Sequence, residues 1–303
     1  MATARVRAPE DGFTEPPVAG AQPRRRPYVR RFFRDRLAMT GLAIVVAFGL
    51  AAVFAPALSP HDPNAQEVLA RLAPPSLEHP LGTDHLGRDM LSRLLYGTRW
   101  SLGAAVAATL LVLVIGLPAG LVAGYYGGLL DTMIMRLVDV LLALPPLVIA
   151  LAVVGTLGPG VRNVMIALVG VTWVLYARVV RGLALSLRDR EYAVAARALG
   201  ASNFRIMSRH IVPNMISPVL VLASLQTGKL LLALAALGFF GLGVQPPTPE
   251  WGTMLNQGRA FLTSAPQLMI YPGAAITLVV LGFNLLGDGL RDVFDPRLVA
   301  TGR

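Results

Sequence analysis

Six long apolar windows dominate the chain, each separated from the next by a polar or proline-rich segment. A helix needs about 20 residues to cross the hydrocarbon core of a bilayer, and each window is close to or above that length. The pattern therefore predicts an all-α polytopic membrane protein with six transmembrane helices. The windows cover residues 37–58, 101–123, 133–157, 163–181, 213–243 and 267–290.

Composition supports this interpretation. Hydrophobic residues make up 54% of the 303 residues and charged residues only 15%, and the mean hydropathy is +0.60. These values are too apolar for a soluble globular chain of this length. The chain has no cysteine, which excludes a disulfide framework, a thiolate metal site and a cysteine nucleophile.

The distribution of basic residues predicts the orientation in the membrane. An even number of spans places both termini on one side, and the N-terminal tail is rich in arginine. Under the positive-inside rule that side is the cytoplasm. The segments then expected inside hold 20 basic residues and those expected outside hold 6. We therefore expect both termini to be cytoplasmic, in the inner membrane of a bacterium, and we attribute the net charge of +10 to orientation rather than to nucleic-acid binding.

The chain divides into four segments. Residues 1–27 combine several prolines with small and polar residues and are expected to form a disordered cytoplasmic tail. Residues 28–100 hold the first span and an external loop, residues 101–297 hold the other five spans, and residues 298–303 form a short tail. Residues 30–34 look like a twin-arginine export signal, but five further spans follow the first apolar window, which favours a retained anchor.

The segment between the fourth and fifth windows predicts a helical hairpin at the membrane face. Gly200 is placed to end the first helix in the left-handed conformation, Ser202 or Asn203 to cap the next, and Pro213 to occupy the first turn of the following span. Four residues at positions i, i+3, i+4 and i+7 form a shallow apolar strip on the first helix. They are Tyr192, Ala195, Ala196 and Leu199.

This hairpin resembles the EAA loop of ABC-importer permeases, whose coupling helix seats in a cleft of the partner ATPase. Ala195, Ala196, Gly200 and Pro213 stand at the positions of that family's Ala, Ala, Gly and Pro, whereas the family's Glu falls at Val194. An ordinary basic cytoplasmic loop is the alternative interpretation. The resemblance implies an ATPase-coupling loop over about 188–212, with the candidate residues Glu191, Tyr192, Ala195, Ala196, Arg197, Leu199, Gly200 and Pro213.

The loop before the second window carries the spaced groups Gly-Thr-Asp, Gly-Arg-Asp, Ser-Arg, Tyr-Gly and Arg-x-Ser-Leu within residues 81–102. This pattern resembles permeases of dipeptide and oligopeptide importers. Thr83 or Asp84 is expected to cap a helix that lies along the membrane surface. The apolar face of that helix would consist of Leu86, Met90, Leu91, Leu94 and Leu95.

A second external segment, residues 238–255, resembles the same permeases. Its three prolines, Pro246, Pro247 and Pro249, exclude a helix there and predict a rigid lip at the outer mouth. Trp251 is interpreted as an interfacial anchor. The candidates for an external loop or for docking of a binding protein are Asp84, Arg88, Asp89, Pro246, Pro247 and Trp251.

Candidate chemistry in the rest of the chain is sparse. Asp84, His85 and Asp89 are residue types that bind metals, but Arg88 and Arg93 lie beside them, so we predict no metal site. Because no phosphate-binding loop and no Ser/His/Asp constellation occurs, we expect no enzymatic activity and no cofactor in this chain.

The windows contain few ionisable residues of the kind that ion-driven transporters use. Asp139 follows Arg136 by three residues, which favours an ion pair within one helix. Lys229 is the chain's only lysine and could line a polar translocation path with Gln226 and Asn284. Glycines recur every four residues in the second window, at 116, 120 and 124, a spacing that promotes close helix packing.

Together with residues 286–297, four blocks between about residue 28 and residue 297 resemble the peptide-importer permeases. The chain is identified as a C-type permease subunit of such an importer. The resemblance implies a second homologous permease, two cytoplasmic ATPases that bind ATP and Mg²⁺, and an external solute-binding protein. A stand-alone secondary transporter or channel and a non-transporting scaffold are the alternatives, and the cargo stays open between dipeptides, longer peptides and nickel.

Overall fold

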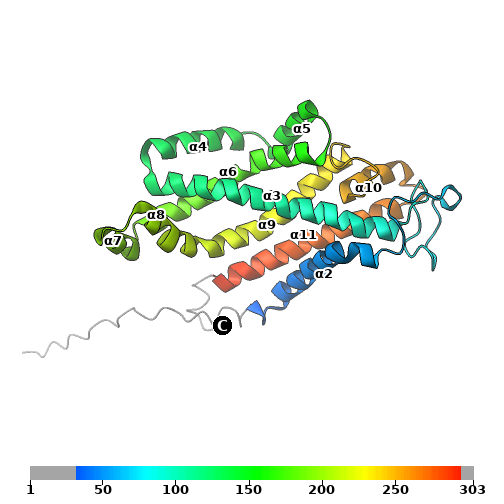
Figure 1. The fold of residues 1–303 in the computed structure, drawn as a ribbon, viewed down its shortest axis with the longest axis horizontal. Coiled ribbons are helices and arrows are strands. Elements are labelled where there is room, and N and C mark those ends of the chain that lie inside the picture. The colour runs from blue at the N-terminus through cyan, green and yellow to red at the C-terminus, as the bar shows by residue number, and fades with distance from the viewer. Residues whose placement is uncertain (1–31, 295–303) are drawn as a thin grey trace, which may run out of the picture.

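The computed structural model describes residues 32–294, and within this range the chain folds into helices joined by loops (Figure 1). The terminal tails predicted at 1–27 and 298–303 lie outside the described residues. The helices in chain order are α2 (Arg36–Leu58), η1 (Val68–Ala70), α3 (Met90–Tyr126), α4 (Gly128–Leu142), α5 (Pro146–Leu157), α6 (Val161–Arg188), α7 (Glu191–Ala198), α8 (Asn203–Ile206), the π-helical turn η2 (Met207–Ile211), α9 (Val212–Phe239), α10 (Trp251–Gly258), η3 (Arg259–Phe261) and α11 (Gln267–Phe294).

Five continuous helices are long and apolar enough to cross a membrane: α2, α3, α6, α11 and the unbroken run Asn203–Phe239. The window predicted as one straight span over 133–157 is instead two helices, α4 and α5, with an angle of 85° between them. The reason is the pair Pro145–Pro146, because a proline ring excludes the preceding residues from helical geometry and removes a donor. Pro146 accordingly begins α5.

The bent pair α4 and α5 nevertheless completes a sixth crossing. The Arg188 guanidinium donates to the carbonyl of Gly124 at 3.1 Å, so the end of α6 lies beside the end of α3. At the other end, Gly160 N donates to Leu242 O at 3.0 Å, so the start of α6 lies beside the end of α9. The chain between α3 and α6 must therefore return along the whole length of α6. Among the described residues, six crossings are present as predicted, and one of them is broken.

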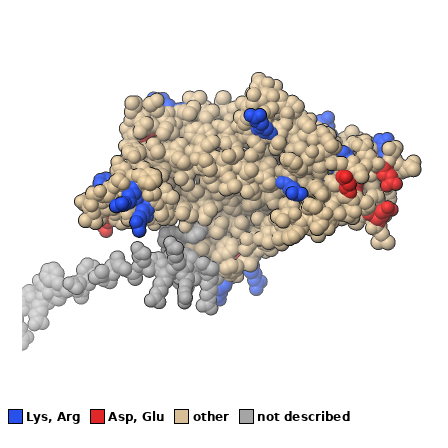
Figure 2. Space-filling model, viewed as in Figure 1, with Lys and Arg blue, Asp and Glu red and all other residues tan. Residues whose placement is uncertain are grey.

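The described chain begins and ends at the same end of the helical bundle, the end that also holds α7 and α8 (Figure 1). Helices α2 and α11 run antiparallel, because Gly289 packs on Ala38 and Gly41 packs on Leu286. Charged side chains gather toward the two ends of the molecule, whereas the surface between them is mostly uncharged (Figure 2). This is the distribution expected of a bundle that crosses a bilayer.

The glycines at four-residue spacing in α3 lie against α6. A Cβ atom added at Gly116 would lie 2.7 Å from the Tyr176 Cβ, and one at Gly120 would lie 2.4 Å from the carbonyl oxygen of Ala177. At Gly124 it would lie 2.6 Å from the carbonyl oxygen of Arg181. The predicted packing role of these glycines is therefore confirmed: α3 and α6 approach too closely for any side chain at these positions.

Ion pairs connect α4 to α6. Asp139 pairs with Arg178, and Asp131 pairs with Arg181, whose Nη2 donates to Asp131 Oδ2 at 2.6 Å. The prediction that Asp139 pairs with Arg136 within its own helix is wrong. The cause is the bend after Leu142, which lays α4 alongside α6 and brings the acidic face of α4 to the arginines of its neighbour.

Replacement of Gly120 by alanine is expected to destabilise the bundle. The added Cβ meets a backbone carbonyl that cannot rotate away, and overpacking of this kind costs about 1–3 kcal/mol. The thermal midpoint of the purified chain in detergent should fall. Gly103→Ala is the matched control, because Gly103 lies in the same helix and a Cβ atom added there would meet no atom within 4 Å. Equal midpoints for the two variants would contradict the prediction.

Candidate functional site

The predicted hairpin at the end of α6 forms as a short helix, a turn and a second helix. Helix α7 ends in a Schellman motif, in which Ala201 N donates to Ala196 O and Gly200 N donates to Arg197 O, both at 3.0 Å. Gly200 has φ +79°, the left-handed conformation predicted from the sequence. Ser202 then caps α8 by accepting from Arg205 N. The turn is thus closed by hydrogen bonds at both sides.

Pro213 lies in the first turn of α9, as predicted from the sequence, but the second helix of the hairpin does not end before it. Helix α8 continues through η2 into α9 as one run, Asn203–Phe239. The π-helical turn at Met207–Ile211 precedes Pro213, whose missing N–H removes a regular helical hydrogen bond at this point. The hairpin is therefore rigidly continuous with a transmembrane helix.

An open groove of about 460 Å³ lies between the two arms of the hairpin. All four residues of the predicted apolar strip line it, so the strip is one continuous surface, with Leu199 88% exposed. Ala195 is exposed whereas Ala196 is buried at the base. The lining is completed by Gly200, Ala201, Arg205 and His210. The groove thus combines a shallow apolar floor with a basic rim.

Two predicted residues lie away from this groove. The Arg197 guanidinium lies 6.0 Å from the centre of the Tyr125 ring, a cation–π contact with the end of α3. Glu191 is exposed in the first turn of α7, where a negative charge favours the helix dipole. The geometry therefore separates groove-lining residues from residues that support the hairpin.

A buried apolar cluster attaches the hairpin to the bundle. Ala193, Ile206 and Ile211 are fully buried in it, together with Val180 and Ala184 of α6. Ala193 is not among the residues predicted from the sequence, because the apolar strip lies on the neighbouring face of α7. Tyr125 of α3 adds a hydrogen bond from its hydroxyl to Asn203 Oδ1 at 2.9 Å. Displacement of the hairpin must therefore move α3, α6 and α9 as well.

The residues predicted to form a polar translocation path do not form a hydrogen-bonded group in the described structure. Gln226 is buried, Lys229 on the same helix is exposed, and Asn284 of α11 is half-buried. The buried polar contact near them joins other residues, the hydroxyls of Thr109 and Thr227, which lie 2.9 Å apart. The proposed path through these three residues stays a prediction.

At the outer end, Asp84 is the centre of a buried charge network. Its Oδ1 accepts from Leu86 N and Arg88 N, and its Oδ2 accepts from Arg88 Nε at 2.7 Å, with Arg93 Nε at 3.4 Å. Both arginines also donate to Gln257 Oε1 of α10. Asp84, Arg88 and Asp89 are all less than 5% exposed. Their side chains therefore hold the loop together and are not available at the surface of this chain.

The predicted helix along the membrane surface is wrong in its start and its course. The cap is Asp89, whose Oδ2 accepts from Ser92 N at 2.7 Å, and the helix that begins at Met90 is the outer extension of α3. Asp84 instead closes a turn over residues 84–88. Its carboxylate pairs with Arg88 and Arg93, the two arginines that the sequence places beside it.

The lip at 241–250 is non-helical as predicted, and Pro246 and Pro247 are exposed on it. Trp251, however, is fully buried, so its interpretation as an interfacial anchor is wrong. Its Nε1 donates to Leu94 O at 3.2 Å and its ring packs edge-on against Phe48 at 5.8 Å. Helix α10 turns back onto α3 and carries the ring into the core.

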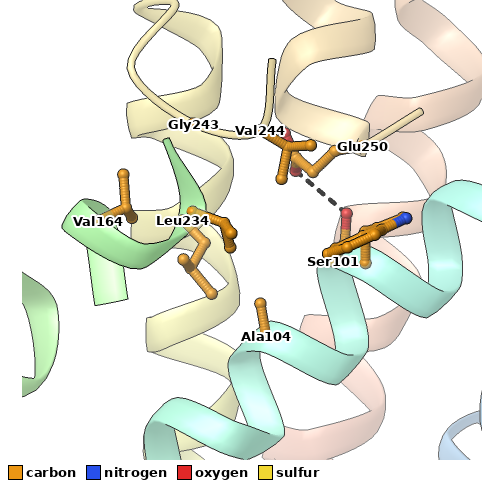
Figure 3. Close-up of a pocket in the computed structure, with 9 residues that line it drawn as sticks. Ser101, Ala104, Val164, Leu234, Gly243, Val244 and Glu250 are labelled. Carbon is orange, nitrogen blue, oxygen red and sulfur yellow. Dashed lines mark hydrogen bonds between the residues drawn. The ribbon is translucent and has the colours of Figure 1, made fainter. Parts of the chain in front are cut away.

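Glu250 was missed from the sequence and is the most heavily bonded carboxylate of this region. It caps α10, accepting from Gly252 N, Thr253 N and the Thr253 hydroxyl, and Ser101 of α3 donates to its Oε1 at 3.1 Å (Figure 3). Burial raises the pKa of the Glu250 carboxyl, and the four donors offset part of this rise. The signal for this cap in the sequence was an acidic residue directly before the start of a helix.

Comparison with known proteins agrees with this architecture. Residues 116–300 match the family model described as the binding-protein-dependent transport system inner membrane component, and residues 27–75 match the N-terminal TM domain of oligopeptide transport permease C. The chain is 43% identical to a dipeptide transport system permease protein of Alkalihalophilus pseudofirmus over 290 residues, which cover 96% of this chain and 93% of the relative.

Two further relatives align over similar fractions of this chain and of their own length. A glutathione transport system permease protein of Pectobacterium atrosepticum is 44% identical over 274 residues, 90% of this chain and 91% of the relative. A dipeptide transport system permease protein of Haemophilus influenzae is 41% identical over 88% of this chain and 92% of the relative.

The fold and these matches define a multi-pass membrane permease. The chain belongs to the family of binding-protein-dependent transport system inner membrane components, and it is a permease subunit of an ABC importer. The family predicted from the sequence is thereby confirmed. The alternatives of a stand-alone secondary transporter and of a scaffold lose their support.

The stability of the chain should depend on pH through Glu250. Because its pKa is higher in the folded state than in the unfolded state, the free energy of unfolding falls as pH rises from the usual glutamate pKa through the raised value, and then levels off. Glu250→Gln removes this component, so thermal midpoints measured against pH should give a flatter profile.

The same variant loses one acceptor for the buried donors and should be less stable by about 1–3 kcal/mol overall. Glu67→Gln is the control, since Glu67 is exposed in the same outer region and should keep the wild-type pH profile. An unchanged slope for Glu250→Gln would contradict the assignment.

Proposed function

We propose that this chain forms half of the translocation pathway of an ATP-driven importer of peptides that an external solute-binding protein delivers. Relatives at 41–45% identity are named dipeptide and glutathione permeases, and both cargo types are short peptides or peptide-like molecules. The observation that carries the coupling part of the proposal is the hairpin groove, because it exposes an apolar floor on a segment continuous with a transmembrane helix.

An exposed apolar face of the chain supports one of the proposed partners, a second permease. The 85° bend leaves α4 and α5 with exposed apolar side chains such as Met133, Val140 and Val148, a face suited to lipid or to a second permease of the same family. Two ATPase subunits would bind ATP and Mg²⁺, and this chain would hydrolyse nothing itself. We assign no cofactor and no nucleic acid to it.

The orientation would place the hairpin and both termini in the cytoplasm of the cell that holds this chain in its inner membrane. Arg190, Arg205 and Arg209 lie in or next to the hairpin, and the positive-inside rule puts such a group inside. The opposite end, with the 81–89 loop and the exposed prolines of the lip, would then face the binding protein.

The mechanism uses the rigidity of the hairpin. Helix α7 would contact the ATPase through Tyr192, Ala195 and Leu199. Closure of the ATPase pair on ATP would then push on α7. The buried Ala193 and the Tyr125–Asn203 hydrogen bond would transmit this displacement to α3, α6 and α9. Since α3 and α6 pack too closely to move separately, they would rock together with α9 and switch the pathway between its inward and outward states.

On the outer side, a broad groove of about 560 Å³ is the proposed docking surface. It lies between the chain leaving α2 and the lip before α10, and it is lined by Asp62, Asn64, Tyr96, Trp100 and Pro249 among others. Aromatic and polar side chains on a rigid backbone are the residue types enriched at protein interfaces.

The test of the proposal uses Ala195, which is exposed in the coupling groove. Ala195→Arg introduces an unpaired charge into the ATPase contact, and a buried unpaired charge costs about 2–5 kcal/mol, so peptide uptake should fall at least tenfold. The ATPase subunits should also be lost from the complex isolated through a tag on this chain. Uptake of labelled peptide and ATPase activity of the eluate are the measurements.

Ala198→Arg is the matched control, because Ala198 is exposed on the same helix but does not line the groove. It should keep at least most of the uptake, and both variants should insert at wild-type abundance. Normal uptake by Ala195→Arg at normal abundance, or a chain that purifies without any ATPase, would overturn the proposal.

A further inference from the structure

Three side chains with metal-binding chemistry meet on the outer loop between α2 and α3. His61, Glu78 and His79 each place one ligand atom so that all three lie within 4.8 Å of one another. This cluster lies outside the coupling groove, and the proposed transport mechanism assigns no role to its three side chains. It also differs from the group at 84–89, for which the sequence predicts no metal site.

The backbone at both histidines is held in place by hydrogen bonds. His61 N donates to Ser92 Oγ at 3.1 Å, and the Ser59 hydroxyl donates to His61 O at 2.7 Å. His79 N donates to Ser76 Oγ at 3.0 Å, while Ser76 N donates to His79 O at 2.9 Å. These contacts fix the backbone from which both imidazoles extend, so a ligand would find the site partly formed.

The buried carboxylate of Asp89 orients His79. The His79 Nδ1 lies 3.0 Å from Asp89 Oδ1, whose other oxygen accepts from Ser92 N. Since an ionised carboxylate only accepts, Nδ1 carries the proton and Nε2 offers a lone pair. A carboxylate that fixes the tautomer of a histidine in this way is the usual second contact of a metal-binding histidine.

His61 supplies the second observation. Its Nδ1 is buried and has no hydrogen-bond partner among the described residues, lying 3.9 Å from Asp89 Oδ1. Its ring stands against that of His79, with centroids 4.7 Å apart. A buried ring nitrogen without a partner is unfavourable, and a neutral imidazole nitrogen is the commonest metal ligand in proteins.

We propose that His61, Glu78 and His79 bind a divalent transition-metal ion of the Zn²⁺ class on the outer face of this chain. Two imidazoles and a carboxylate are a donor set that favours Zn²⁺ over Mg²⁺ or Ca²⁺. The two carboxylates of Glu78 and Asp89 balance the double charge of the ion. Zinc bonds of about 2.0–2.2 Å need a closer approach of the ligand atoms, which the exposed Glu78 side chain can supply by rotation.

The ion would fasten the chain leaving α2 to the turn at 76–79. His61 also lines the broad outer groove, beside Tyr96, Trp100 and Pro249. Bound metal would therefore stiffen one wall of that groove and leave one coordination position for water or for an incoming side chain. Binding of the ion to this chain does not depend on the transport function proposed above.

The experiment uses the full chain in detergent, purified through a histidine-free affinity tag and treated with chelator. Titration with Zn²⁺ by calorimetry should show one equivalent bound per chain, and excess Mg²⁺ should not compete. His61→Gln and Glu78→Gln should each weaken binding at least about tenfold. Zinc should also raise the thermal midpoint of the wild type and leave that of the two variants unchanged.

His85→Gln is the control, because His85 lies in the same loop but stacks on Phe261 at 5.4 Å and is outside the cluster. It should bind zinc like the wild type. Glu78 is exposed, so its variant tests the site without risk to folding. For His61→Gln, the thermal midpoint measured without metal verifies that the variant is folded. Absence of saturable binding at micromolar zinc, wild-type affinity in both cluster variants, or an equal loss in His85→Gln would overturn the proposal.

Discussion

The close contact of α3 with α6 is the constraint on which the rest of the bundle depends. Glycines at 116, 120 and 124 leave no side chain between α3 and α6 over the last turns of α3, so the two backbones come into contact there. Arg188 therefore donates to the carbonyl of Gly124. Tyr125 and Ala184 belong to the buried cluster against which the hairpin packs. In a membrane, where apolar surfaces gain little by meeting each other, such van der Waals contact is a principal source of helix association.

The two ends of the bundle are built on opposite principles. The hairpin end exposes an apolar groove on a rigid support, which suits a partner that pushes. The outer end buries its polar groups: Asp84 with two arginines, Glu250 with four donors, and Trp251 with Leu94 O. A network of this kind specifies one conformation, because each buried group would be costly without its partner. Helix α3 connects the two ends, because its Tyr125 bonds to Asn203 of the hairpin and its Ser101 bonds to Glu250 at the outer end.

Errors in the sequence-based predictions share one cause. Trp251 and Asp139 were each assigned from their neighbours in sequence, yet each finds its partner on another helix: Leu94 and Arg178. The split of the 133–157 window is a local effect of Pro145–Pro146, but its angle of 85° depends on how α5 packs on α6. The histidines of the proposed metal site, at positions 61 and 79, are separated by a loop that no periodicity describes.

By itself the sequence determined the all-helical membrane class, the six crossings, the Gly200 turn and the apolar strip of the hairpin. These features depend on local rules, since apolar length, a left-handed glycine and helical spacing each act within a few turns. Only the tertiary structure decided that the strip forms a groove, that α8 and α9 are continuous, that Trp251 is buried and that His61 meets His79. Those outcomes depend on contacts between segments far apart in the chain, and a pattern within one segment carries no information about the distance to another.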